Sequence, residues 1–176
     1  MKKIDNKLLM EFIKKAVNRL SGDWIIIGGS VLQLLNIDVR VTTDIDVAGP
    51  DSATQKDTLT LMDVATEIGL PVEAINQAAS YFLYKIPDWQ SSLVLVQAGK
   101  LGRILRPNTG LFIKLKLARL TPSDLDDCLA MLHYAKQQKE QIDTKSLQKI
   151  IKSMMKTETN GEKKHRMQFL FAELSL

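Results

Sequence analysis

The chain has 176 residues, of which 45% are hydrophobic and 25% are charged. This size suits one compact domain with a short appendage, and the balance excludes fibrous and disordered classes. The single cysteine, Cys128, excludes an internal disulfide and a zinc site built on several thiolates. No apolar run reaches the roughly 18–20 residues of a membrane helix, and the N-terminus lacks the apolar stretch of a signal peptide. We therefore expect a soluble, cytoplasmic protein that has no membrane partner.

The formal net charge of +4 is concentrated at the C-terminal end of the chain. Residues 136–176 contain eight lysines and one arginine against five acidic residues, so residues 1–135 are close to neutral. A neutral body with a basic end indicates an acidic partner, such as nucleic acid. The alternative interpretation is a solvated, lysine-rich helix face.

In the first third of the chain, the hydrophobic pattern predicts helices and strands in alternation. Apolar residues at helical spacing predict a helix over 4–20. The short β-branched run Trp24–Ile27 predicts a buried strand, and Gly28-Gly29-Ser30 then ends it and opens a short helix over 31–36. Alternation of apolar and polar residues predicts a strand over 40–47, with Asp44 and Asp46 on its polar face.

The remaining pattern predicts further strands followed by helices. A helix over 52–67 is expected to turn Leu59, Leu61, Met62, Ala65 and Ile68 inward. Residues 70–92 fit either helical turns or a strand. Strands are expected over 92–97 and 102–105, and helices over 111–120, 122–136, 144–155 and 162–173. This order predicts an α/β or α+β domain over residues 1–135 and a basic helical extension over residues 136–176.

The strongest chemical signal is the combination of Gly28-Gly29-Ser30 with Asp44-x-Asp46. Two glycines after a buried strand present backbone N–H groups that suit phosphate oxygens, and the Ser30 hydroxyl adds a donor. Two aspartates separated by one strand residue point to the same side, where their charges repel each other unless a cation lies between them. Mg²⁺ prefers a few carboxylates together with phosphate oxygens. The pattern therefore favours phosphoryl or nucleotidyl transfer, although each half alone is common as a turn or a solvated pair.

Gly28-Gly29-Ser30 followed by Arg40-x-Thr42-x-Asp44-x-Asp46 resembles the active-site signature of the nucleotidyltransferase fold, the DNA polymerase beta superfamily. A second stretch is also similar to the small bacterial members associated with abortive infection and toxin–antitoxin systems: Lys116, then Asp124 and Asp127 at the start of the next helix. The resemblance spans about residues 8–135. It implies a mixed sheet flanked by helices.

The resemblance also implies a role for each matching residue. Gly28, Gly29 and Ser30 would contact the triphosphate, and Asp44 and Asp46 would ligate Mg²⁺, or Mn²⁺ in its place. Lys116 would neutralise phosphate charge, with Asp124 and Asp127 lining the same cleft. Asp44, Asp46 and Lys116 are accordingly the predicted catalytic residues.

Several of these residues also have plain structural interpretations. Thr121-Pro122-Ser123-Asp124 is a helix-capping sequence, which by itself accounts for Asp124. Asp127 could face solvent and Lys116 could belong to a lysine-rich surface. Cys128 is expected in the core, and the two histidines, His133 and His165, are expected to be exposed.

One departure from the family pattern keeps more than one function open. Active enzymes of this fold usually carry a third carboxylate on a later strand, and the candidate strand over 92–97 has none. The leading hypothesis is an enzyme that transfers a nucleotidyl group from a nucleoside triphosphate to RNA, protein or a small molecule. The second is a catalytically inactive partner, the antitoxin or regulatory half of a two-gene system. The third is a general nucleic-acid binder that is sensitive to salt and indifferent to Mg²⁺.

Overall fold

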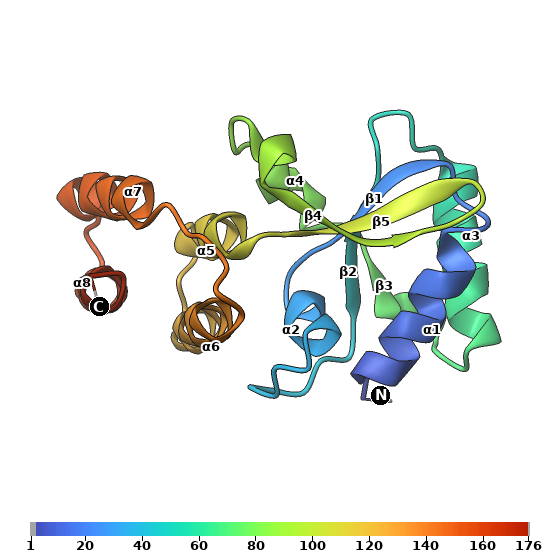
Figure 1. Ribbon diagram of the computed structural model, residues 1–176, viewed down its shortest axis with the longest axis horizontal. Helices are drawn as coiled ribbons and strands as arrows, with labels where there is room; N and C mark the ends of the chain where they lie inside the picture. The colour runs from blue at the N-terminus through green and yellow to red at the C-terminus, as the bar shows by residue number, and fades with distance from the viewer. Residues whose placement is uncertain (1–2, 176) are drawn as a thin grey trace. The chain divides into compact units, whose positions relative to one another are not determined.

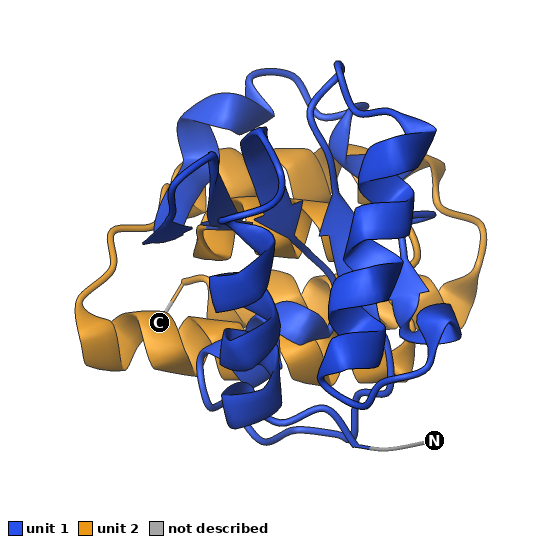
Figure 2. Ribbon diagram, turned by 90° about the vertical axis from the view of Figure 1, so that its right-hand side faces the viewer, with its two compact units in different colours: residues 1–107 blue, residues 108–176 orange. Residues whose placement is uncertain are grey.

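The computed structural model describes residues 3–175, and the chain forms two compact units. Unit 1 comprises residues 1–107 and unit 2 comprises residues 108–176 (Figure 2). The boundary between the two units, after Pro107, differs from the domain boundary after residue 135 that the sequence predicted. The physical reason is that the helices over 109–138 share a hydrophobic core with the two C-terminal helices.

Unit 1 is built on a five-stranded mixed sheet in the order β3-β2-β1-β5-β4 (Figure 1). The central strand β1 (Gly22–Ile26) pairs antiparallel with β2 (Ile45–Ala48) and parallel with β5 (Gly102–Pro107). β3 (Ile75–Asn76) extends the sheet beside β2, and β4 (Leu93–Ala98) forms the other edge. The predicted mixed sheet and the buried Trp24–Ile27 run are confirmed.

Helices of unit 1 pack around one another beside this sheet. α1 (Asn6–Ala16) contacts both α2 (Ser30–Leu34) and α3 (Gln55–Glu67), and buries Leu9, Phe12, Ile13 and Ala16. Side-chain caps begin two of these helices: the Asp5 carboxylate accepts from Leu8 N–H at the start of α1, and Thr54 forms a capping box at the start of α3.

Two expectations for unit 1 were wrong in detail. The strand predicted over 40–47 begins only at Ile45, and the preceding Val41 is 60% exposed, because residues 41–43 form no ladder with a neighbouring strand. Leu59 was expected to face inward but is 54% exposed on α3. The ambiguous stretch over 70–92 contains a 3₁₀ turn at Val72–Ala74, the short strand β3, the short helix α4 (Ser80–Leu83) and a second 3₁₀ turn at Trp89–Ser92.

Unit 2 consists of helices that share one hydrophobic core. α5 (Thr109–Leu117) packs on α6 (Pro122–Gln138) and α7 (Thr144–Thr157), and α8 (Gly161–Glu173) packs on α6 and α7. Each contributes to a cluster of buried residues: Ile113, Leu117, Leu120, Cys128, Leu132, Leu147, Ile151, Met167, Leu170 and Leu174. No helix in the described part of the chain has the length and apolar character required to cross a bilayer.

Candidate functional site

The turn after β1 places a glycine directly against the Asp46 carboxylate. Gly28 has φ +61°, in the left-handed region that side chains with a Cβ rarely adopt. A Cβ added at Gly28 would collide with Oδ2 of Asp46 and would lie 2.7 Å from its Cγ. The predicted meeting of the glycine turn with the acidic strand is therefore seen at this pair of residues.

Ser30 ties the same turn to the acidic strand through its hydroxyl group. The Ser30 Oγ donates to the carbonyl of Asp44 at 3.0 Å and accepts from the backbone N–H of Asp46, also at 3.0 Å. Ser30 is fully buried. Its hydroxyl is thus engaged with the backbone on both sides of Ile45, so that it positions both aspartates.

Asp44 and Asp46 are both half-buried, and they lie in different local settings. Asp44 immediately precedes β2 and accepts a hydrogen bond from the Thr43 hydroxyl at 3.2 Å. Asp46 lies within β2, and its Oδ1 accepts from the Asn76 side-chain amide at 2.7 Å. The two carboxylates are the residues of this site that could hold a divalent cation. Among the described residues no group of three or more His, Cys, Asp or Glu side chains is arranged to do so.

Asn76 is a site residue that the sequence did not predict. It lies on β3 in register with Asp46, and its Oδ1 accepts from Ala78 N–H at 3.1 Å, which orients the amide group toward the carboxylate. We expected the strand bearing the next functional group to be the one over 92–97, which is at the far edge of the sheet as β4. The feature of the sequence that could have indicated Asn76 is its place directly after the short apolar stretch that follows Pro71.

Arg40 and Thr42 lie beside the second glycine of the turn. A Cβ at Gly29 would come within 2.9 Å of the Arg40 Nη2 and 3.2 Å of the Thr42 Oγ1. Thr42 is 6% exposed, and its hydroxyl has no hydrogen-bond partner among the described residues. The Gly29 backbone thus has a guanidinium group and a hydroxyl donor close to it, both of a kind that binds phosphate oxygens.

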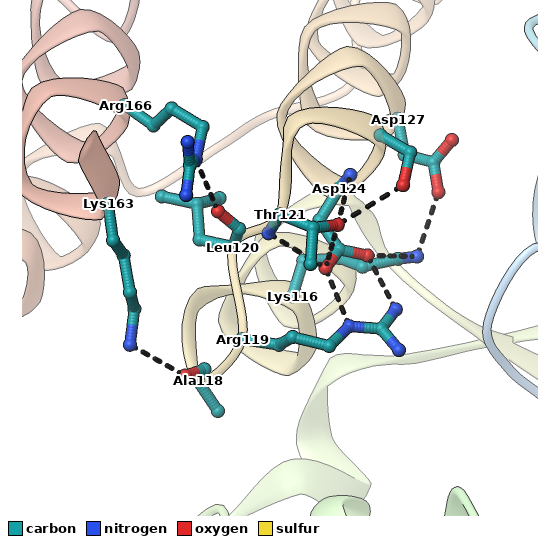
Figure 3. Close-up of polar contacts among 10 residues, drawn as sticks. Lys116, Ala118, Arg119, Leu120, Thr121, Asp124, Asp127, Lys163 and Arg166 are labelled. Carbon is teal, nitrogen blue, oxygen red and sulfur yellow. Dashed lines mark hydrogen bonds and ion pairs between the residues drawn. The ribbon is translucent and has the colours of Figure 1, made fainter. Parts of the chain in front are cut away.

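The predicted residues Lys116, Asp124 and Asp127 belong to unit 2, where they form a buried cluster of their own (Figure 3). The Lys116 Nζ donates to the Asp124 Oδ1 at 3.0 Å and to the Asp127 Oδ2 at 2.8 Å. The three side chains are 8%, 1% and 0% exposed, respectively. The expectations that Asp127 could face solvent and that Lys116 could belong to a lysine surface were wrong. The cluster links α5 to α6.

Asp124 combines this ion pair with the predicted helix cap. Thr121 and Asp124 form a capping box at the start of α6, and the Arg119 guanidinium donates twice to Asp124 at 2.8 Å. Burial by itself favours the neutral acid. The hydrogen bonds from Arg119 and Lys116 nevertheless outweigh burial and hold the pKa of Asp124 well below its usual range.

Basic residues of α8 close the turn between α5 and α6 from the other side. The Lys163 Nζ donates to the carbonyl of Ala118 at 2.8 Å, and the Arg166 Nε donates to the carbonyl of Leu120 at 2.7 Å (Figure 3). Cations commonly satisfy carbonyl groups that a helix C-terminus leaves without partners. Two basic residues of the C-terminal part of the chain, Lys163 and Arg166, therefore help to stabilise the fold of unit 2.

The cysteine and the two histidines of unit 2 have the burial that the sequence predicted. Cys128 is fully buried, and burial raises the pKa of its thiol. His133 and His165 are exposed.

Comparison with known protein families tests the resemblance of this chain to the nucleotidyltransferases. Residues 2–174 match the model of a family described as "Nucleotidyltransferase of unknown function (DUF6036)". No curated protein and no solved structure matched the chain. Because the match covers nearly the whole chain and both units, this protein belongs to that family of nucleotidyltransferases of unknown function.

Proposed function

We propose that this protein binds a nucleoside triphosphate together with Mg²⁺ and transfers the nucleotidyl group to an acceptor in RNA, protein or a small molecule. The observation that carries the proposal is the contact between the Gly28 turn and the Asp46 carboxylate. It brings backbone suited to phosphate next to a carboxylate suited to a divalent cation.

The donor set of unit 1 fits a magnesium ion shared with a triphosphate. Asp44 and Asp46 would hold the ion, and Mg²⁺ is commonly bound by one or two carboxylates plus substrate phosphates. The Asn76 amide would hold Oδ1 of Asp46 in place, and the Ser30 hydroxyl would fix the backbone of both aspartates. All of these contacts are made within the chain, so they would hold the carboxylates in place without a contribution from the substrate.

Groups around Gly29 would orient the triphosphate. The Arg40 guanidinium supplies positive charge, and the Thr42 hydroxyl supplies a donor for a phosphate oxygen. When bound, Mg²⁺ would supply charge neutralisation for the leaving pyrophosphate and activation of the acceptor oxygen. The chain's own residues would contribute positioning and electrostatic stabilisation.

The test is calorimetric titration with non-hydrolysable analogues of the four nucleoside triphosphates, with and without Mg²⁺. We expect Asp44→Asn and Asp46→Asn to keep the fold and to abolish Mg²⁺-dependent binding. Asp51→Asn, which changes an exposed carboxylate of the same unit by the same chemistry, is the matched control and should bind like the parent protein. Equal affinity in all variants would refute the site.

A second function is favoured by Asn76, because the side chain that faces Asp46 from the neighbouring strand is an amide and not a carboxylate. An amide cannot accept a proton as a general base. The protein would then be a catalytically inactive partner, for example the antitoxin or regulatory half of a two-gene system.

Incubation with labelled nucleotides, cellular RNA and cellular protein separates the two functions. Label on any acceptor, lost in Asp46→Asn, excludes the inactive partner. If no label appears, Asn76→Asp is the decisive variant: transfer gained on adding the acid would identify the amide as the reason for inactivity.

A further inference from the structure

One helix of unit 2 carries a row of lysines along its exposed side. α7 (Thr144–Thr157) contains Lys145, Lys149, Lys152 and Lys156 and no acidic residue, and all four lysines are exposed. Their spacing of four, three and four residues places them within about 60° of one another around the helix. At about 1.5 Å per residue the row is about 16 Å long. We name these four residues the lysine row.

The orientation of the lysine row is fixed by the core of unit 2. Leu147 and Ile151 on the opposite side of α7 are buried, and Ile150, Met154 and Met155 pack against the same core. Because its apolar side is already covered, α7 cannot lay that side into a lipid bilayer, as interfacial helices do. The exposed side therefore offers charge without an accompanying apolar surface.

The lysine row differs in its partners from three basic residues of unit 2 that help to hold its helices together. Lys116 is paired with two carboxylates, and Lys163 and Arg166 bind carbonyls and acidic residues. None of the four lysines of the row forms an ion pair or side-chain hydrogen bond with another residue in the range 3–175. Like charges three and four residues apart destabilise an isolated helix. Repulsion among the four lysines therefore destabilises α7, and the packing of α7 on the core of unit 2 offsets this loss of stability.

We propose that the lysine row binds the phosphodiester backbone of a nucleic-acid strand. Lysine is a point charge that contacts phosphate without reading base identity, and a straight row of four suits a polymer with regularly repeated negative charges. Binding itself does not depend on the proposed nucleotidyl transfer. The further step, that this strand is the acceptor, rests on the proposed function.

Fluorescence anisotropy with a labelled single-stranded RNA, in EDTA and without nucleotide, tests the binding. The test variant changes Lys145, Lys149, Lys152 and Lys156 to glutamine. The control variant changes four exposed lysines of unit 1 to glutamine and so has the same net charge: Lys7, Lys14, Lys56 and Lys100. Circular dichroism checks that both variants keep the helical content of the parent protein.

The expected effect follows from counterion release. Four phosphate contacts on a single strand give a slope of about −2.8 in log affinity against log salt, or about a 50-fold loss between 50 and 200 mM salt. We expect the parent and control proteins to show this dependence. The lysine-row variant should bind at least tenfold more weakly at 50 mM salt and lose most of the slope. Equal losses in the two variants, or none in the lysine-row variant, would overturn the proposal.

Competitors identify the source of the phosphodiester. Competition by RNA alone, by DNA of the same sequence alone, or by both equally would each support backbone binding and name the nucleic acid. Stronger competition by polyglutamate or by phosphatidylserine vesicles would overturn it in favour of an acidic protein or a membrane surface. Asp46→Asn should retain full RNA binding, so a failure of the proposed nucleotide site leaves this result interpretable.

Discussion

Replacing Lys116 with methionine is expected to lower the free energy of unfolding by about 3–5 kcal/mol, the usual cost of removing one partner of a buried ion pair. Methionine preserves the length and the apolar stem of lysine but removes the ammonium group. Asp124 and Asp127 would then lose donors at 3.0 and 2.8 Å. Both carboxylates would remain buried without the cation that now lies between them.

The burial of the two carboxylates explains why the expected loss of stability is large for the substitution of a charged residue. The side chains of Asp124 and Asp127 are 1% and 0% exposed, so water can neither screen the pair nor solvate the charges left behind. Asp124 keeps its hydrogen bonds from Arg119 and Thr121 in the variant.

Urea denaturation followed by circular dichroism measures the change. Lys114→Met, two residues earlier on α5 and half-buried, is the matched control and should change stability by no more than about 0.5 kcal/mol. Combining Lys116→Met with Asp127→Asn should recover part of the loss, because the second change removes the buried charge.

A different outcome would refute this reasoning about Lys116. If Lys116→Met keeps the stability of the parent protein but loses affinity for magnesium-bound nucleotide, the lysine contacts phosphate, as the family resemblance implies. The buried ion pairs would then be dispensable for the fold of unit 2.

Other consequences concern the glycine turn and the pH response. Ser30→Ala should cost about 1–3 kcal/mol in urea denaturation, because Asp46 N–H loses its buried acceptor; an unchanged midpoint would contradict this. Gly28→Ala should weaken nucleotide binding at least tenfold in calorimetry, since the added methyl group displaces the Asp46 carboxylate. The pKa of Asp124 is lowered by folding, so its stabilising effect is complete above about pH 4, near the unfolded value, and decreases as pH falls further. Asp124→Asn should therefore reduce the dependence of the unfolding free energy on pH below about 4. Asp126→Asn, which changes an exposed residue of the same helix, should leave this dependence unchanged.

The sequence was informative wherever a short stretch of chain determines its own conformation. The buried strand at Trp24–Ile27, the glycine turn after it, the Thr121 capping box and the amphipathic helices of the C-terminal part are all found as predicted. Each depends on periodicity, capping or φ preference over a few residues, and these preferences act locally. The shortened β2 shows the limit, because alternation was present over 40–47 but only Ile45–Ala48 pairs with neighbouring strands.

What the sequence determined by itself was the pairing of a glycine turn with two aspartates, and with it the family. Tertiary structure alone decided that Asn76, 30 residues away, lies beside Asp46, and that Lys116, Asp124 and Asp127 are buried together. The physical reason is that strand order and burial arise from packing between distant segments. A polar residue in the sequence looks the same whether water or an ion pair will satisfy it.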